Sequence, residues 1–402
     1  MVNLINNNIV LSLGLILIFG IIIAYFIERL KLPVVTGYII LGILLGPYVA
    51  HLVPKTLLTH SNLIANVVLS IVAFMISRNF SYTTFKKTGK QILSVSLLEA
   101  SSSWLFVTLG VFFFLRKPLY IALLLGALSA ATDPASTLMV SREYKTRGPV
   151  TNVLLGTVAI DDAWGLIIFV ISMIIAIQTK GGNAIHISPI KMIGGAVLEI
   201  IYTLGIGAIA GFVALPLSRL IHHKSSKLIL SLGFILLTAG IAMYLHYSPL
   251  LACMALGTVV VNFAEGERDY FEGIEFFAAP LLLVLFVVVG AGFNLKAFAS
   301  IGAVGGIYIV MRFIGKYTGA TIGATLSKAP KTVRKYVGIG LVPQAGVALG
   351  MAVLGEQYFP GTGQYILTVI IATTLILEVF GPPITKIVLK KAGEITLKEV
   401  EK

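Results

Sequence analysis

Charged residues are scarce in this sequence. Asp, Glu, Lys and Arg make up only 12% of its 402 residues, against about 25% in a typical soluble domain. The single cysteine, Cys253, excludes an internal disulfide framework. No polar stretch is long enough for a soluble domain of useful size, and only a brief charged tail follows Lys390. These absences exclude a soluble globular protein.

The N-terminus has neither a basic segment nor a small-residue cleavage site, so we expect its first apolar run to be a retained span rather than a signal peptide. The net charge of +13 does not indicate a nucleic-acid partner. Excess Lys and Arg in a membrane protein usually marks the cytoplasmic loops.

Apolar runs recur from end to end, and 57% of the residues are hydrophobic. A helix needs about 20 apolar residues to cross a bilayer. The sequence therefore predicts an all-α polytopic protein in a lipid bilayer, with thirteen transmembrane helices. The predicted spans are 8–28, 33–53, 61–77, 92–115, 118–140, 149–178, 192–216, 227–245, 247–263, 274–292, 297–325, 333–355 and 363–389.

Basic residues in the loops predict the orientation. With the N-terminus outside, the inside segments hold 22 Lys and Arg residues and the outside segments hold 6. This bias favours a multi-pass protein of the plasma membrane with an outside N-terminus and a cytoplasmic C-terminus.

Two adjacent acids, Asp161 and Asp162, lie in the middle of the predicted span 149–178. A charge at the centre of a membrane helix costs ~2.5–3.5 kcal/mol on insertion scales. We therefore expect a cation, a proton or a basic side chain to neutralise these carboxylates.

Two other spans carry helix-breaking residues. Thr132-Asp133-Pro134 interrupts one span, with Ser136 just beyond, and a proline kink capped by Asp133 is the simpler alternative. The run 338–346, which includes Gln344, interrupts a span in the other half of the chain. Paired interruptions of this kind indicate a transporter binding site.

Arg312 and Lys316 are one helical turn apart inside a span and share a helix face. A buried lysine needs a carboxylate, and Asp161 or Asp162 is the expected partner. Alternatively one base extends to the membrane surface, which suits Arg312 better. Glu99, followed by three serines, either supports a basic residue or faces a polar crevice.

Several motifs together resemble the cation:proton antiporter superfamily. They agree in order and spacing from about residue 10 to 390, and the adjacent Asp pair resembles the electrogenic, NapA-like and Kef-like branch. The motifs are Pro33–Tyr38, Leu41–Pro47, Thr132–Pro134, Asp161–Asp162, Val289–Phe293, the Lys316 helix and Val342–Gly346. The sequence departs from the family at Ser77–Phe80, where relatives often have Gly-Leu-Glu, and a Kef-type nucleotide-binding domain is not expected.

The resemblance implies an inverted-repeat fold with two broken, crossing helices and a homodimer. Its implied division follows the chain order. Residues 1–91 and 227–295 form dimerisation helices, 92–180 and 296–392 form the ion-transport core, 181–226 forms a linker helix, and 393–402 forms a short charged cytoplasmic tail.

The resemblance also implies roles for individual residues. Asp162 matches the aspartate that binds the ion and the proton, and Asp161 matches the one that pairs with Lys316. Thr132 and Asp133 complete the predicted binding site. The expected supporting polar groups are Glu99, Arg312, Gln344 and Ser136.

The function predicted is secondary transport rather than an enzyme reaction: Na⁺, or Li⁺, exchanged for protons in pH homeostasis, without a cofactor. A K⁺/H⁺ exchanger or K⁺ efflux protein on the same scaffold is the alternative. An intramembrane aspartyl protease is remote, since its Tyr-Asp and Gly-x-Gly-Asp motifs are missing. No His or Cys lies near the acids, so no transition-metal site is expected.

Overall fold

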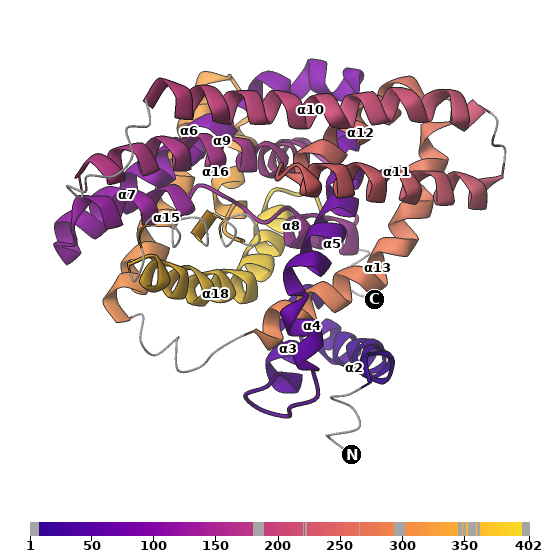
Figure 1. Cartoon of the computed structure of the whole chain (residues 1–402), viewed down its shortest axis with the longest axis horizontal. Helices are drawn as coiled ribbons and strands as arrows, with labels where there is room; N and C mark the ends of the chain where they lie inside the picture. The colour runs from indigo at the N-terminus through magenta and orange to yellow at the C-terminus, as the bar shows by residue number, and fades with distance from the viewer. Residues whose placement is uncertain are drawn as a thin grey trace.

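The computed structural model describes residues 8–179, 189–219, 221, 223–264, 266–292, 302–344, 348, 351–352, 359 and 362–395. The regular structure in these ranges is helical (Figure 1). In chain order the elements are α2 (Ile9–Arg29), α3 (Val34–Leu45), α4 (Lys55–Thr59), α5 (Ser61–Ile76), the 3₁₀ turn η1 (Ser77–Phe80), α6 (Tyr82–Leu115), α7 (Leu119–Leu128), α8 (Pro134–Glu143), α9 (Pro149–Thr179), α10 (Pro189–Arg219), α11 (Lys224–Tyr244), α12 (Pro249–Phe263), α13 (Glu267–Ala291), α15 (Gly302–Leu326), α16 (Lys331–Gly340) and α18 (Thr362–Lys391).

The predicted all-helical membrane fold is confirmed. Among the described residues, eight helices are long and apolar enough to cross a membrane, and shorter apolar helices accompany them. A described helix overlaps each predicted span, but the spans 297–325 and 333–355 extend over residues outside the described ranges, and the count of thirteen crossings stays a prediction. α6 starts at Tyr82, ten residues before the predicted membrane span 92–115, and three lysines and Gln91 in this extension are good helix formers.

The helices pack in two groups (Figure 1). In one group α6 packs along α15 and against α7 and α9, and α16 and α18 complete the contacts. In the other, α3 packs against α13, and α5, α11 and α12 pack together beside it. The long helix α10 contacts α9 of the first group and α12 of the second.

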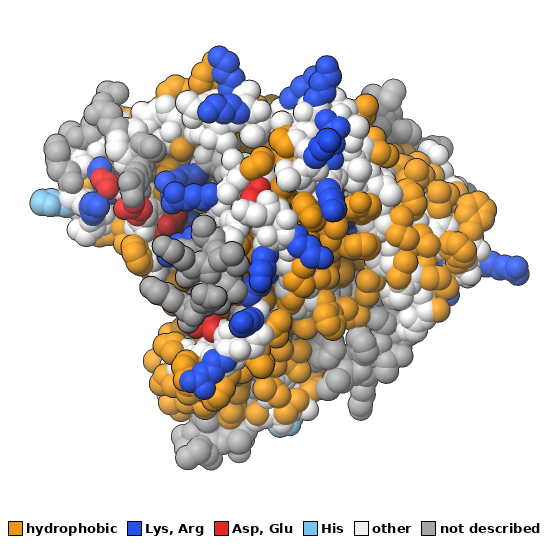
Figure 2. Space-filling view, turned by 180° about the vertical axis from the view of Figure 1, so that it is seen from behind, with side chains coloured by type: hydrophobic (Ala, Val, Ile, Leu, Met, Phe, Trp, Pro, Cys, Tyr) orange, Lys and Arg blue, Asp and Glu red, His pale blue; other side chains and the backbone are white. Residues whose placement is uncertain are grey.

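Broad apolar areas lie on the surface (Figure 2). In α2, for example, Val10 is 79% exposed and Ile21 is 70% exposed. Such areas are much larger than a water-soluble monomer tolerates, and they suit contact with lipid. Lysine and arginine side chains gather between the apolar areas on the face that Figure 2 shows.

Candidate functional site

The first predicted break lies between α7 and α8. α7 ends at Leu128 and α8 begins at Pro134, which has no N–H to donate and therefore suits a first helical position. The Asp133 carboxylate accepts the N–H of Ala135 at 3.1 Å and that of Ser136 at 2.7 Å. Asp133 thus caps α8, where a negative charge complements the helix dipole.

The second break follows α16, and it meets the first. The N–H of Asp133 donates to the carbonyl oxygen of Pro343 at 3.1 Å. The side-chain amide of Gln344 donates to the carbonyl oxygen of Leu128 at 2.8 Å. The two breaks therefore meet, at a point called the crossing, while the last two residues of the motif 342–346 lie outside the described residues.

Arg312 joins the two breaks. Its guanidinium donates to four backbone carbonyls, those of Ser129 at 3.1 Å, Ala131 at 2.9 Å, Val342 at 2.6 Å and Pro343 at 3.2 Å. Carbonyls at a helix break lose their helical donors and need others inside a membrane. Arg312 is 1% exposed, so it does not extend to an aqueous edge.

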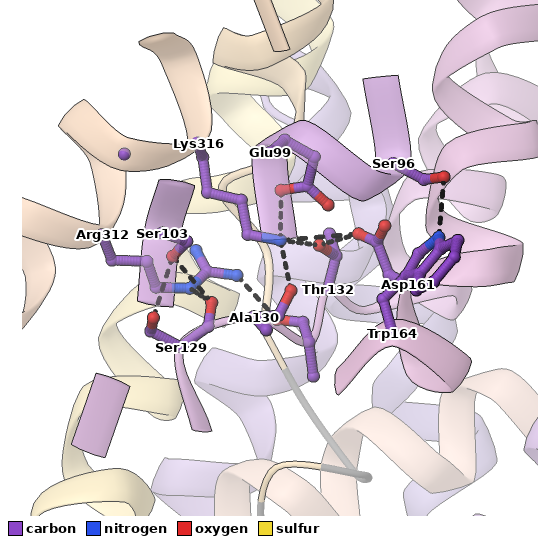
Figure 3. A network of polar contacts seen from close by, with 12 residues as sticks. Ser96, Glu99, Ser103, Ser129, Ala130, Thr132, Asp161, Trp164, Arg312 and Lys316 are labelled. Carbon is purple, nitrogen blue, oxygen red and sulfur yellow. Dashed lines mark hydrogen bonds and ion pairs between the residues drawn. The ribbon is translucent and has the colours of Figure 1, made fainter. Parts of the chain in front are cut away.

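Lys316 lies one turn further along α15, surrounded by oxygens (Figure 3). Its ammonium lies 2.6 Å from a carboxylate oxygen of Glu99 and 3.4 Å from one of Asp161. It also donates to the Thr132 hydroxyl at 2.7 Å and to the Ala130 carbonyl. Lys316 thus has two carboxylate partners, and the one predicted only as a supporting group, Glu99, is the nearer.

Glycines of α15 explain why Glu99 comes so close. A Cβ added to Gly319 would lie 2.3 Å from the carbonyl oxygen of Leu98, and one at Gly315 would lie 2.6 Å from the Cα of Ser103. Only glycine permits this approach of the α6 and α15 backbones. Side chains of the two helices, Lys316 among them, therefore meet over a short distance.

The two adjacent acids of α9 have different surroundings. Asp161 accepts a hydrogen bond from the Thr132 hydroxyl at 2.6 Å and faces Lys316. Asp162 is 3% exposed, and neither of its carboxylate oxygens has a hydrogen-bond donor among the described residues. The Thr157 hydroxyl is likewise buried without a partner among the described residues.

Buried oxygens without donors are suited to bind a proton or a hard cation. A carboxylate left unpaired inside a protein loses a large hydration free energy, which a proton or a cation restores. Hard monovalent and divalent cations prefer oxygen ligands. Asp161, Asp133 and Lys316 are the charged groups that act on Asp162, so the occupancy of this carboxylate depends on all three.

The sequence matches a known family over most of its length. Residues 14–391 match the family model described as sodium/hydrogen exchanger, transmembrane. The chain belongs to this family. Its named relatives are antiporters rather than enzymes.

Two prokaryotic relatives of this exchanger-family chain cover most of it. It is 25% identical over 309 residues to the probable Na⁺/H⁺ antiporter 2 of Methanocaldococcus jannaschii, covering 72% of this chain and 71% of the relative. It is 20% identical to the K⁺/H⁺ antiporter subunit KhtU of Bacillus subtilis, covering 94% of this chain and 93% of the relative.

A plant relative is longer. The chain is 24% identical to the cation/H⁺ antiporter 19 of Arabidopsis thaliana over 69% of its own length, but it spans only 36% of that relative. Among solved structures, the sodium proton antiporter MjNhaP1 of M. jannaschii has a TM-score of 0.67 at 20% identity, covering 97% of this chain and 98% of that one. The exchanger fold is therefore shared.

Most of the predicted site residues of this exchanger-family chain come together. Thr132, Asp161, Glu99 and Lys316 form one network, shown in Figure 3. Arg312, Asp133 and Gln344 hold the crossing, and Ser136 lies in the first turn of α8.

Sequence reasoning missed one buried acid, Glu378 of α18, which is 0% exposed. The rule that singled out the Asp pair, a charge inside an apolar span, would have found it.

Proposed function

We propose that this chain exchanges a monovalent cation for protons by alternating access, with Na⁺ as the first candidate and Li⁺ as the second. The observation that carries the proposal is the Asp162 carboxylate, which is buried without a donor among the described residues beside a fixed Asp161. A carboxylate that binds either a proton or a cation, and that faces the two sides in turn, exchanges one for the other.

Lys316 provides the second charge of the proposed cycle. A cation at Asp162 lies near the Lys316 ammonium and lowers its affinity for its proton. Asp162 and Lys316 then each release one proton as one cation binds, so the cycle moves net charge, as in the electrogenic Asp-Asp branch. Cation-driven current in a Lys316→Gln variant equal to the wild-type current would remove the lysine from this scheme.

Movement of one group of helices past the other provides the alternation in our proposal. Two hydrogen bonds between the helix groups support the proposal that the movement occurs at this interface. The Glu143 carboxylate at the end of α8 accepts the N–H of Val34 at 2.9 Å, and Lys386 of α18 donates to the carbonyl of Lys31 at 2.6 Å. In our proposal these contacts break once per cycle, and the helices of 1–91 and 227–295 form the homodimer.

We also propose the membrane and the orientation. The excess of Lys and Arg in alternate loops supports a plasma-membrane protein with its N-terminus outside and its C-terminus in the cytoplasm.

Exchange in proteoliposomes tests the function. A pH-sensitive dye inside the vesicles reports proton movement when Na⁺, Li⁺ or K⁺ is added outside. We expect dequenching with the wild type and background signal with Asp162→Asn, which keeps the shape but loses the charge. Asp269→Asn is the matched control, because Asp269 lies at the start of α13 and pairs, among the described residues, with Lys224 and Lys227 of α11. Wild-type exchange by Asp162→Asn would contradict the assignment.

A K⁺/H⁺ exchanger is the second candidate. The similarity to KhtU, which is named a K⁺/H⁺ antiporter subunit, supports this candidate, because it extends over nearly the whole chain. The salt series decides between the two. A response to K⁺ at lower concentration than to Na⁺ would select the second candidate with the same residues.

A further inference from the structure

Acids outnumber bases in the buried centre of the protein. Seven charged side chains among the described residues are at most 3% exposed. The acids are Glu99, Asp133, Asp161, Asp162 and Glu378, and the bases are Arg312 and Lys316. A membrane interior does not hold three uncompensated negative charges. Several of these carboxyls must therefore carry a proton or a cation.

One of the five acids has no task in the exchange proposed above. Lys316 contacts two of them, Glu99 and Asp161, while Asp133 caps α8 and Asp162 binds the exchanged ion in our proposal. The backbone N–H of Gln344 lies towards the Glu378 carboxyl, but neither carboxylate oxygen has a partner with hydrogen-bond geometry among the described residues. The Thr374 hydroxyl, one turn earlier on α18, is also buried without a hydrogen-bond partner among the described residues.

Glu378 lies on the face of α18 that packs against the second break. A Cβ on Gly381 would lie 2.7 Å from Cγ of Pro343, so the two backbones touch there. Thr385, one turn further, donates to the carbonyl oxygen of Gly340 at 3.3 Å. Residues 378, 381 and 385 follow helical spacing, so the Glu378 carboxyl faces the crossing.

Two charged groups face Glu378, Asp133 from α8 and Arg312 from α15. The other helices that pack against α18 add little charge. α3 and α7 contain no Asp, Glu, Lys or Arg, only one tyrosine each, and the basic residues of α16 lie in its first turns, 331–335. Lys386 lies two turns further along α18 and bonds to the carbonyl of Lys31.

Arg312 does not form a close ion pair with Glu378. Its donors serve four carbonyls of the crossing, and no ion pair within 4.0 Å joins it to a described carboxylate. A buried carboxyl that faces an acid and lacks a close base is neutral unless a cation reaches it. A bound proton is therefore the simplest way to neutralise Glu378 in this state.

We propose that Glu378 is a further proton-binding group of the exchange site, besides Asp162 and Lys316, where α18 packs against the second break. This inference rests on the exchange function proposed above. Asp133, which acts on both Asp162 and Glu378, lies between the two in the charge network. Cation binding at Asp162 favours loss of the Glu378 proton, because the added positive charge stabilises the carboxylate.

The same linkage acts in the other direction and determines how the affinity for the cation changes with pH. As the pH rises, Glu378 loses its proton, and its negative charge strengthens cation binding at the crossing. In Glu378→Gln the side chain stays neutral at every pH. The variant should therefore match the wild type at low pH and bind the cation more weakly at high pH.

The experiment measures the KM for Na⁺ across a pH series in proteoliposomes, with the wild type, Glu378→Gln and the matched control Glu199→Gln on α10. We expect the KM of Glu378→Gln to exceed the wild-type value about tenfold at the alkaline end, for one charge near the site, and to converge with it at the acid end. Glu199→Gln should follow the wild type throughout.

A KM curve for Glu378→Gln parallel to the wild-type curve would overturn the proposal, since a structural role alone changes KM or kcat equally at all pH values. If Glu378→Gln does not fold, Glu378→Asp replaces it. That variant keeps a titrating carboxyl, so it should keep the pH dependence of KM, and a flat curve would count against us. Failure of the exchange function looks different, because the wild type itself would then move no cation.

Discussion

Two pairs of helices in this protein approach each other closely, but the side chains around the two contacts differ in polarity. Where α3 crosses α13, a Cβ on Gly42 would lie 2.1 Å from the carbonyl oxygen of Val287, and one on Gly290 would lie 2.1 Å from that of Ile39. A hydrophobic cluster that includes Leu41, Leu283 and Val287 lies there. Where α6 crosses α15, equally close glycine contacts place Lys316 beside its two acids.

The comparison shows that a close helix contact can either stabilise the packing of two helices or position charged side chains. The α3–α13 contact gains stability from packing alone, since small residues let backbones approach closely in a membrane. The α6–α15 contact uses the same geometry to bring a base within reach of carboxylates. The crossing next to it depends on hydrogen bonds to buried backbone carbonyls that have no helical partner. Mutations should therefore damage the two regions in different ways.

The largest effect should come from the crossing. Arg312→Met leaves the buried carbonyls of Ala131 and Val342 without a donor among the described residues, whereas those of Ser129 and Pro343 keep the Ser103 hydroxyl and the Asp133 N–H. Unsatisfied buried groups cost ~1–3 kcal/mol each. We expect a large fall in the apparent Tm in detergent and no exchange. Arg312→Lys keeps the charge but not the fork of donors, so it should recover only part of the Tm. A Tm equal to wild type in Arg312→Met would show that the breaks do not depend on this side chain.

An intermediate effect should come from the apolar contact. Gly42→Ala forces a methyl group into the backbone of α13, and overpacking costs ~1–3 kcal/mol. The apparent Tm should fall, while the ion affinity of the remaining folded protein stays at the wild-type value. Gly14→Ala is the matched control, because nothing lies within 4 Å of a Cβ there. An unchanged Tm for Gly42→Ala would mean that α3 and α13 can separate without cost.

The smallest effect should come from the start of α9, away from both regions. The Glu394 carboxylate accepts the N–H groups of Val150 and Thr151, each at 2.7 Å, and so caps the helix that carries the Asp pair. Glu394→Gln removes the charge, and loss of a helix cap costs ~0.5–2 kcal/mol. The apparent Tm in detergent should fall slightly.

Glu275→Gln is the control for the cap. It removes half-exposed ion pairs with Arg78 and Arg142, and such pairs contribute ~0–1 kcal/mol. A larger fall in Tm for this control than for Glu394→Gln would contradict the capping role.

Local features of the fold could be predicted from the sequence. The apolar runs predicted the helices, and Pro134 predicted the first break. A proline lacks the N–H that a helix needs, so it disrupts a helix whatever the tertiary structure around it. The acids and bases inside apolar runs indicated the site for a similar reason, since a charge in a membrane helix needs a partner. The extension of α6 before residue 92 was not predicted, because hydropathy alone does not distinguish its polar first turns from a loop.

Pairings between helices could not be predicted in this way. The sequence placed Lys316 opposite the Asp pair, but the contact of α15 with α6 brings Glu99 nearer, at 2.6 Å. Whether Arg312 reaches water or a buried acceptor also depends on where the two breaks meet.

The sequence by itself determined that this chain is a bundle of membrane helices with acids, bases and broken helices near its centre. These properties follow from hydropathy and backbone chemistry within single segments. Only the tertiary structure decided that Arg312 bonds to the carbonyls of both breaks and that Glu378 faces the crossing. Those contacts join segments far apart in the chain, and the physical reason is the close approach that glycines and the crossed breaks allow.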